Sequence, residues 1–278
     1  MSKASSLERR AQSRPASETR WQTSITKIEP NKILVRGYPL DELMGRMTFG
    51  EAVYLLLMGE LPSPSIGRLM EAVLLSSIDH GATPPSTLAA RNVATSGAAL
   101  RNAVAAGLLA FGRHHGGDIE PCLHFLDSGL ALVRAGTAYH KAAETIVARC
   151  EEDGELPPPG FGHRFHTRDP RAARLFQMAL ELEIEGEHIR MIRAVEQVLS
   201  QRGGDPQPIN VEGAIAAVCG DIGIPAEIGN ALFLIARVPG LVAHVHEERA
   251  RHSAMRQIDP KDHVYDGPTD RRLPETRK

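Results

Sequence analysis

The sequence predicts an all-α protein, because helix-start and helix-stop residues recur along almost the whole chain while only one segment has the pattern of paired strands. Near the N-terminus, residues 25–27 and 33–35 flank the turn residues Pro30-Asn31-Lys32, which predicts a small hairpin. With 42% hydrophobic residues, the 278-residue chain can form one substantial core, or a large domain with a small domain packed on it.

Residues typical of helix starts and helix ends recur after the hairpin. Thr48 and Glu51 form a capping-box pattern ahead of a helix over residues 52–58, and Gly59 supplies its stop. Further predicted helices are bounded by Ser63-Pro64 and Gly81, by Asp169-Pro170 and Leu182, by Asn210 before residues 211–219, and by Pro225 before an apolar stretch to His246. About ten helices are expected in total. Pro239 interrupts the last stretch, and its missing N–H predicts a kink or a break there.

The overall charge is close to neutral. The 32 Lys and Arg residues nearly balance the 34 Asp and Glu residues, so no general attraction to nucleic acid or anionic lipid is expected. Cys122, Cys150 and Cys219 are an odd number without a CxxC pair, and each lies in an apolar helical pattern. They are expected to be buried thiols in a reducing compartment.

The two ends of the chain differ in composition from its middle. Residues 1–21 predict a disordered arm, and residues 266–278 predict a mobile tail. No signal-peptide pattern follows Met1, and no uninterrupted apolar run approaches the roughly 20 residues that a membrane-spanning helix needs. The expected location is the cytoplasm, without a membrane partner.

A loop rich in proline and glycine covers residues 156–163. Its consecutive prolines stiffen the backbone, whereas Gly160 and Gly162 let the backbone approach a ligand closely. The loop is therefore predicted to be a rigid platform that presents His163, and an ordinary connector is the alternative interpretation.

Polar residues that interrupt otherwise apolar or glycine-rich segments form the candidate site. They are His80, His114, His115, His163, Arg171, Glu212 and Arg237. Histidine, carboxylate and arginine side chains together can transfer protons, stabilise an enolate and bind carboxylates. Each also has a structural interpretation: His80 as a cation at a helix C-terminus, Glu212 as an acid in a first helical turn, and Arg237 as part of a buried salt bridge.

The 12 histidines make a metal site the obvious alternative. His244 and His246 fall in a predicted helix, where positions i and i+2 point about 200° apart and cannot share an ion. No HExxH or cysteine–histidine spacing occurs elsewhere. We therefore expect neither a metal nor a permanently bound cofactor.

Four segments, in order, resemble the citrate synthase family. Residues 34–62 resemble its N-terminal signature, residues 159–171 its central active-site loop, and residues 209–213 and 235–244 its later active-site segments. The matches span roughly residues 22–268, which makes them far more specific than a lone GxGxH. The family's fold implies a multi-helix protein with a large and a small helical domain.

The resemblance also implies domain boundaries. The large domain is expected to comprise residues 22–158 and 223–265, with the small domain and active-site loop over residues 159–222 between them. The compact length, and Ile258-Asp259-Pro260 where synthases usually have Arg-Pro, are similar to the citryl-CoA lyase branch. The family's two-fold packing implies a homodimer.

The resemblance assigns roles residue by residue. The implied catalytic residues are His163 at the oxo-acid oxygen, where it accepts the hydroxyl proton in cleavage, His115 at the thioester enolate oxygen, and Glu212 as acid/base. The implied carboxylate-binding residues are His80, Arg171, Arg237 and Arg256, the last reaching across the dimer interface. The implied contacts to CoA are Pro159, Gly160, Phe161 and Gly162.

Two positions depart from the family pattern. Glu212 stands where the family has an aspartate, and one extra methylene matters because about 1 Å of misplacement can cost on the order of a hundredfold in rate. Asp118 stands where the family usually has a small residue.

Three functions follow as hypotheses. The first is a citryl-CoA lyase that releases acetyl-CoA and oxaloacetate, the second a citrate or 2-methylcitrate synthase, and the third a non-catalytic CoA-ester-binding subunit. The missing arginine and the short chain favour the lyase. No Walker-type phosphate loop is present, so a separate ligase is expected to supply citryl-CoA.

Overall fold

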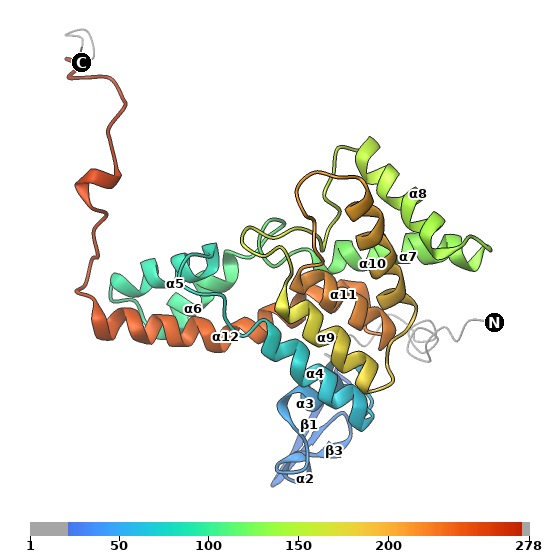
Figure 1. Cartoon of the computed structure of the whole chain (residues 1–278). Coiled ribbons are helices and arrows are strands. Elements are labelled where there is room, and N and C mark those ends of the chain that lie inside the picture. The colour runs from blue at the N-terminus through green and yellow to red at the C-terminus, as the bar shows by residue number, and fades with distance from the viewer. Residues whose placement is uncertain (1–21, 274–278) are drawn as a thin grey trace, which may run out of the picture. The chain divides into compact units, whose positions relative to one another are not determined.

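The computed structural model describes residues 22–273 and divides the chain into two compact units, Met1–Gly67 and Arg68–Lys278. Across the described residues there are eleven α-helices, three short strands and one 3-10 helix (Figure 1). The predicted all-α class with a short N-terminal hairpin is confirmed.

The first unit contains the predicted hairpin. Strands β1 (Thr26–Glu29) and β2 (Lys32–Val35) pair antiparallel around Asn31, whose φ of 59° provides the turn. A third strand that the sequence did not indicate, β3 (Tyr38–Pro39), extends the sheet in the order β1-β2-β3 and leads into α2 (Leu40–Leu43).

Helix α3 (Phe49–Met58) has the predicted ends. The Thr48 side chain accepts a hydrogen bond from the Glu51 N–H, and the Glu51 carboxylate accepts one from the Thr48 N–H. These reciprocal bonds satisfy two donors that the first helical turn leaves unpaired. Gly59 ends the helix in the left-handed conformation, with a φ of 82°.

Helix α4 (Pro64–Ser76) begins where it was predicted but ends before Gly81. The alternative interpretation of His80 as a cation at the end of this helix is therefore wrong. Residues 77–81 instead form a turn in which Asp79 accepts a hydrogen bond from the Gly81 N–H. The Ser77 carbonyl accepts a bond from Arg237 Nε, which fixes the turn beside the last helix.

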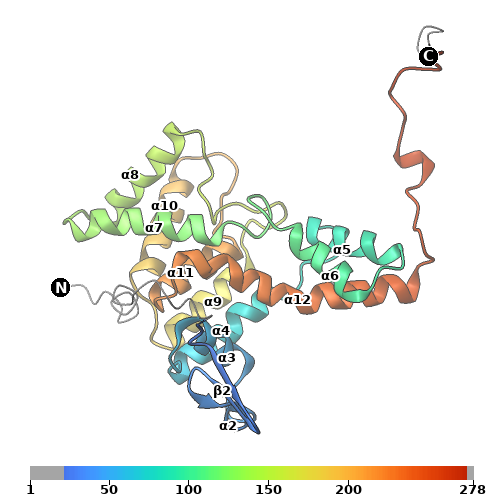
Figure 2. The same ribbon diagram turned by 180° about the vertical axis from the view of Figure 1, so that it is seen from behind.

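The remaining helices belong to the second unit. They are α5 (Pro85–Thr95), α6 (Leu100–Leu109), α7 (Ile119–Arg134), α8 (Tyr139–Glu152), α9 (Pro170–Glu181), α10 (Glu187–Gln201), α11 (Val211–Asp221) and α12 (Ala226–Arg251). Helices α5 and α6 lie along α12, where Leu241 and Val245 complete a small apolar cluster with them (Figures 1 and 2). Helices α7, α9 and α10 surround α11, which is the most buried helix of the unit.

The predicted caps of α9 and α11 are confirmed. Asp169 accepts a hydrogen bond from the Arg171 N–H, and Asn210 accepts bonds from the Glu212 and Gly213 N–H groups. Each cap satisfies otherwise unpaired backbone donors. Glu212 is thereby placed in the first turn of α11.

Helix α12 is continuous through Pro239, so the predicted break does not occur, and the predicted kink stays a prediction. It is long and apolar enough to cross a membrane by length and composition, a test that the core helix of a soluble protein also passes. Here α12 packs against α5, α6, α7 and α11, and these contacts support the helix on both sides of the proline.

Cys122 and Cys219 are buried thiols as predicted, whereas Cys150 is partly exposed near the end of α8, which corrects the third assignment. The predicted arm over residues 1–21 lies outside the described residues. Residues 266–273 of the predicted tail are mostly exposed and contain no helix. The division into a large and a small domain stays a prediction.

Candidate active site

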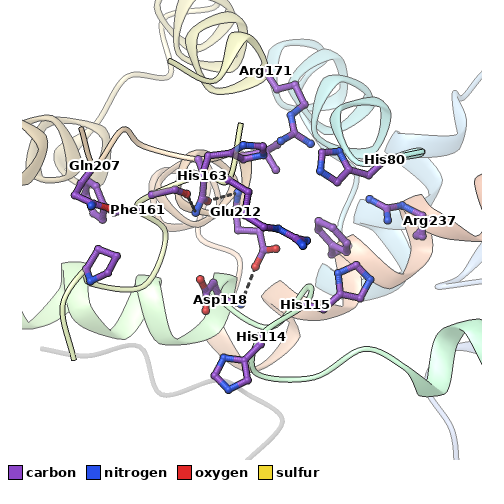
Figure 3. A pocket seen from close by; sticks show the side chains of 16 residues that line it. His80, His114, His115, Asp118, Phe161, His163, Arg171, Gln207, Glu212 and Arg237 are labelled. Atoms are coloured by element: carbon purple, nitrogen blue, oxygen red, sulfur yellow. Dashed lines mark hydrogen bonds between the residues drawn. The ribbon is translucent and has the colours of Figure 1, made fainter. Parts of the chain in front are cut away.

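A cavity of about 430 Å³ in the second unit brings together side chains from distant parts of the chain (Figure 3). Its wall contains six of the seven predicted catalytic and carboxylate-binding residues, namely His80, His115, His163, Arg171, Glu212 and Arg237. Phe161 and Gly162 of the four predicted CoA contacts also line it.

His115 is held by a tight loop between α6 and α7. Gly112 and His115 exchange two backbone hydrogen bonds of 3.0 and 2.9 Å. Gly116 has a φ of 73°, and a Cβ there would lie 2.5 Å from the Phe111 ring. A glycine is therefore required for the chain to turn away directly after the histidine.

The His115 ring is neutral at physiological pH. Burial, followed by the positive charge of Arg237, lowers its pKa to about 4. The ring stacks on Phe111 with centroids 4.7 Å apart, and its Nε2 lies 2.8 Å from Ser86 Oγ. The serine hydroxyl can donate to this nitrogen or accept from it, so the ring hydrogen can lie on either nitrogen.

Backbone donors orient the His163 ring. Its Nδ1 accepts hydrogen bonds of 3.1 Å from the backbone N–H groups of Phe165 and His166. The neutral ring therefore carries its hydrogen on Nε2, where it can donate to a ligand oxygen. Burial, followed by the neighbouring His166, lowers the pKa of His163 below its usual range.

The loop that carries His163 is tied to the start of α11. Phe161 forms an isolated bridge with Ile209, and the Asn210 side chain donates to the Gly162 carbonyl at 3.1 Å. The predicted rigid platform thus has a physical basis in contacts with residues 208–210. Pro159 lines a second cavity of about 470 Å³, whose wall shares Phe161 and Glu212 with the first.

Gly160 is enclosed where this loop meets α7 and α11. A Cβ there would lie 2.6 Å from Cys122 Sγ and 2.7 Å from the Gly213 Cα, and its φ is 85°. We predict that Gly160→Ala costs about 1–3 kcal/mol of stability beyond the roughly 1–2 kcal/mol of left-handed strain. Chemical denaturation measures the cost. The control is Gly154→Ala, because Gly154 has a φ of 71° but an added Cβ there would meet no atom within 4 Å. Equal losses of stability in both variants would contradict the packing argument.

Glu212 is the carboxylate of the cavity. Its Oε2 accepts a 2.8 Å hydrogen bond from the Asp118 N–H, and the Gly116 N–H also donates to it. Burial, reinforced by the charge of Asp118, raises the pKa of Glu212 to about 7. A substantial share of this side chain is therefore a protonated acid at neutral pH.

Arg237 is a fully buried cation without an ion-pair partner among the described residues. Its Nε donates to the Ser77 carbonyl, and its guanidinium lies 4.8 Å from the Phe233 ring centroid. Both Nη atoms are buried without a hydrogen-bond partner in residues 22–273. No described acid forms an ion pair with Arg237, although the charge of Asp79 favours its cationic form, and the unpaired N–H groups suit a ligand carboxylate.

Arg171 and His80 complete the cationic side of the cavity. Arg171 makes two bonds to the buried Asp169 carboxylate, at 2.9 and 2.7 Å, which fix the guanidinium direction. The His80 ring lies edge-on to that of His163, with centroids 5.8 Å apart. Burial, followed by the charge of Arg171, lowers the pKa of His80.

Arg256 does not line this cavity. It follows α12, and its Nε lies 2.9 Å from Glu248 Oε1 in the same chain. Its backbone N–H donates to Thr95 Oγ1. These contacts hold the residues after α12 against the helices of the same chain. The role of Arg256 across a dimer interface stays a prediction.

Sequence reasoning did not identify Ser86 or the ligand-facing position of Phe233. Ser86 lies 29 residues before the histidine that it contacts, and nothing in the sequence pairs them. Asp169 was predicted only as a helix cap, although the same carboxylate also orients Arg171 and accepts from the Val211 N–H. Each role arises from contacts between distant segments.

Comparison with known proteins identifies relatives of this chain. The family model for the citrate synthase C-terminal domain matches residues 17–66 and 62–258. The citrate/2-methylcitrate synthase of Bacillus subtilis is 28% identical over 204 residues, which cover 71% of this chain and 52% of the relative. The chain thus spans about half the length of this curated relative.

Solved structures share the fold. The citryl-CoA lyase of Hydrogenobacter thermophilus is 41% identical, with a TM-score of 0.83, covering 91% of this chain and 97% of the lyase. The ATP citrate lyase of Methanosaeta concilii, solved with (3S)-citryl-CoA, is 21% identical with a TM-score of 0.75, covering 95% of this chain and 44% of that protein. The latter similarity shows the fold alone.

Proposed function

The chain belongs to the citrate synthase family, and we propose that it cleaves citryl-CoA into acetyl-CoA and oxaloacetate. The observation that carries this proposal is Glu212, a carboxyl group with a pKa of about 7 at the wall of a cavity lined by cationic and histidine side chains. Cleavage leaves an enolate that needs a proton at carbon, and a protonated carboxyl group supplies one.

The cationic side of the cavity would bind the oxo-acid half of the substrate. The unpaired Nη groups of Arg237 suit one carboxylate, and Arg171, already oriented by Asp169, suits another. His80 adds a neutral hydrogen-bonding ring beside them. Carboxylate binding there places the carbon–carbon bond that breaks toward His115 and Glu212.

His163 would act as a hydrogen-bond donor to the oxygen on the oxo-acid carbon. Accepting the hydroxyl proton would require an Nε2 without hydrogen, whereas the two N–H groups at Nδ1 favour hydrogen on Nε2. We propose this donor role in place of the implied role of His163 as the acceptor of that proton. The hydroxyl proton then leaves to solvent while the Nε2–H group stabilises the developing charge on oxygen.

His115 and Glu212 would act on the acetyl half. In the tautomer in which Ser86 donates to Nε2, the His115 Nδ1–H would donate to the thioester oxygen as the enolate forms. Glu212 transfers its proton to the enolate carbon and becomes a carboxylate. The electron pair of the broken bond thus ends in the new C–H bond of acetyl-CoA, and the proton released from the hydroxyl balances the one consumed.

The CoA thioester is a substrate in this proposal, and no permanently bound cofactor takes part. The second cavity offers a path for the CoA chain past Pro159 and Phe161 to the acyl site. Gly160 packs against Cys122 and Gly213 on the side where a Cβ would lie, which supports a contribution to the shape of the loop, and its contact with CoA stays a prediction.

A citrate or 2-methylcitrate synthase is the second candidate, favoured by the similarity to the Bacillus subtilis enzyme. The third hypothesis, a non-catalytic CoA-ester-binding subunit, uses the same cavity without turnover. We further propose that the protein acts in the cytoplasm and forms a homodimer. Exposed apolar side chains such as Leu109, Met255 and Val264 support the dimer.

Two incubations distinguish these functions. The purified protein is given citryl-CoA in one and oxaloacetate plus acetyl-CoA in the other, while acetyl-CoA, CoA and citrate are followed. Rapid acetyl-CoA release with negligible citrate synthesis is the expected result. Faster accumulation of citrate and CoA would identify a synthase, and CoA-ester binding without turnover of either mixture would identify a binding subunit.

A further inference from the structure

We propose that His188 is a positioning residue for Glu212: as an imidazolium bonded to both Asp127 and Asp221, it joins α7 to α11 away from the cavity. The inference rests on the proposed function, because it concerns where the proton donor of cleavage is held. Helices α7, α10 and α11 pack against one another (Figures 1 and 2). His188 lies in the first turn of α10.

Both ring nitrogens of His188 face a carboxylate. Nδ1 lies 3.1 Å from Asp221 Oδ1, and Nε2 lies 3.1 Å from Asp127 Oδ1. A neutral ring has a single N–H group, so one of the two carboxylates would then face a ring lone pair. The protonated ring donates to both carboxylates, and this geometry therefore favours the imidazolium.

The surroundings of the ring agree with a charged state. The His188 side chain is only 12% exposed, and that of Asp221 is 1% exposed. Burial alone would lower the pKa of His188, but the hydrogen bonds to Asp221 and Asp127 outweigh burial and raise the pKa above its usual value. Among the described residues, these two carboxylates are the charged groups that act on the ring, one from each neighbouring helix.

Asp221 is held at the end of α11 by the start of α10. Its carboxylate accepts hydrogen bonds of 2.8, 2.9 and 3.2 Å from the N–H groups of Gly186, His188 and Ile189. These bonds replace the side-chain cap that α10 lacks, since its N-cap residue is a glycine. A Cβ on Gly186 would lie 2.5 Å from Asp221 Oδ1, so a glycine is needed for this close approach.

The helices that His188 joins are the two that meet at Glu212. At their N-terminal ends, the Asp118 N–H donates to the Glu212 carboxylate at 2.8 Å. Asp127 and Asp221 lie further along the same two helices, and Asp221 is the last residue of α11. The two helices are thus connected at two places, directly beside the cavity and through the His188 ring away from it.

The packing of α11 transmits a movement at Asp221 to the cavity. Helix α11 has 11 residues, which corresponds to a length of roughly 16 Å, and most of them are buried. A short buried helix moves as one body, so a shift of its last residue changes the position of Glu212 in its first turn. About 1 Å of misplacement of a catalytic group can cost on the order of a hundredfold in rate. Loss of the His188 contacts should therefore slow proton transfer, while Arg171 and Arg237 stay in place on α9 and α12.

His188→Gln tests this inference, because glutamine retains a hydrogen-bond donor but carries no charge. We expect kcat per folded molecule to fall about tenfold or more, with the KM for citryl-CoA nearly unchanged. His188→Lys restores a cation that can donate to both carboxylates, and it should recover part of the lost kcat. His140→Gln is the control, since His140 has the same second position in α8 but pairs with Glu144 on the surface, and it should leave kcat unchanged.

Asp127→Ala breaks the link to α7 alone. The Asp127 side chain is half exposed, so this variant keeps the inference testable if His188→Gln does not fold, and its kcat should also fall. In a Glu212→Gln background, neither substitution should lower the residual rate further, because both act through Glu212. A further fall in that background, or a native kcat per folded molecule in both single variants, would overturn the inference and leave His188 a residue of the fold.

Nuclear magnetic resonance gives a readout that needs no turnover. The nitrogen-15 shifts of His188 should show both ring nitrogens protonated at pH 7, and the Asp118 amide signal should move in His188→Gln but not in His140→Gln. A neutral ring, or an Asp118 amide that His188→Gln leaves unchanged, would overturn the inference whatever the activity. Both signatures in a protein that does not cleave citryl-CoA would support the coupling of the two helices and overturn the proposed function instead.

Discussion

Glu212→Gln is expected to lower citryl-CoA cleavage by about 10²–10⁴-fold, because the amide retains the size of the side chain but cannot transfer a proton. Binding of CoA esters should survive, since the substitution leaves the cationic side of the cavity intact. Steady-state and single-turnover kinetics, with CoA-ester binding measured separately, test both expectations.

A matched control addresses the structural interpretation of Glu212. Glu187 also lies in a first helical turn, that of α10, where its side chain bonds to Arg134 on the surface. Glu187→Gln should leave turnover unchanged. If Glu212→Gln and Glu187→Gln behaved alike, Glu212 would be only a favourable helix acid and the catalytic assignment would be lost.

The same substitution has a stability signature. A carboxyl group whose pKa is raised by folding stabilises the folded state less as pH rises from the unfolded value toward the folded value. For Glu212 this window runs from 4.5 to about 7. The native protein should therefore lose stability across that window, and Glu212→Gln should lose less and have the higher melting temperature at pH 8.

Arg237→Met is expected to remove oxo-acid recognition without unfolding the protein. Losing a buried charged hydrogen-bond donor should cost about 2–5 kcal/mol of transition-state stabilisation. This loss corresponds to a decrease of roughly 30-fold to 4,000-fold in kcat/KM. The ligand-free variant should lose little stability, because removing the desolvated Nη groups, which have no hydrogen-bond partner in residues 22–273, offsets the loss of the Nε bond to the Ser77 carbonyl. Kinetics and thermal denaturation measure the two effects.

Arg190 provides the control for this substitution. Its Nε donates to the Gly186 carbonyl and its guanidinium lies 5.5 Å from the Tyr139 ring centroid, so it makes the same two kinds of contact as Arg237, but on the surface and away from the cavity. Arg190→Met should leave kcat/KM unchanged. A destabilised Arg237→Met with native kinetics would show that Arg237 serves the fold and not the substrate.

Local sequence signals predicted helix starts well because capping is a local interaction. Thr48, Asp169 and Asn210 each bond to backbone groups within three residues, so their positions mark the helix starts directly. The end of α4 depends instead on Arg237, whose Nε bonds to the Ser77 carbonyl from 160 residues away. Contacts with four helices likewise keep α12 continuous at Pro239, which propensity alone disfavours.

The candidate site likewise has features that the sequence predicts and features that depend on contacts between distant segments. Spaced motifs resembling one family placed His115, His163 and Glu212 together, and the structure gathers them around one cavity. Motifs do not determine protonation, because it depends on neighbours that spacing does not reveal. Two backbone N–H groups place the hydrogen of the His163 ring on Nε2, and His115 contacts Ser86 of a distant segment.

Cleavage of citryl-CoA in deuterium oxide tests the central claim most directly. Glu212 exchanges its acidic proton with solvent, so the account predicts that acetyl-CoA forms together with oxaloacetate and carries at least one solvent deuteron in its methyl group. Mass spectrometry of the product after a single turnover, before repeated exchange, measures this label. Formation of citrate and CoA in place of acetyl-CoA, or acetyl-CoA without methyl deuterium, would contradict the account.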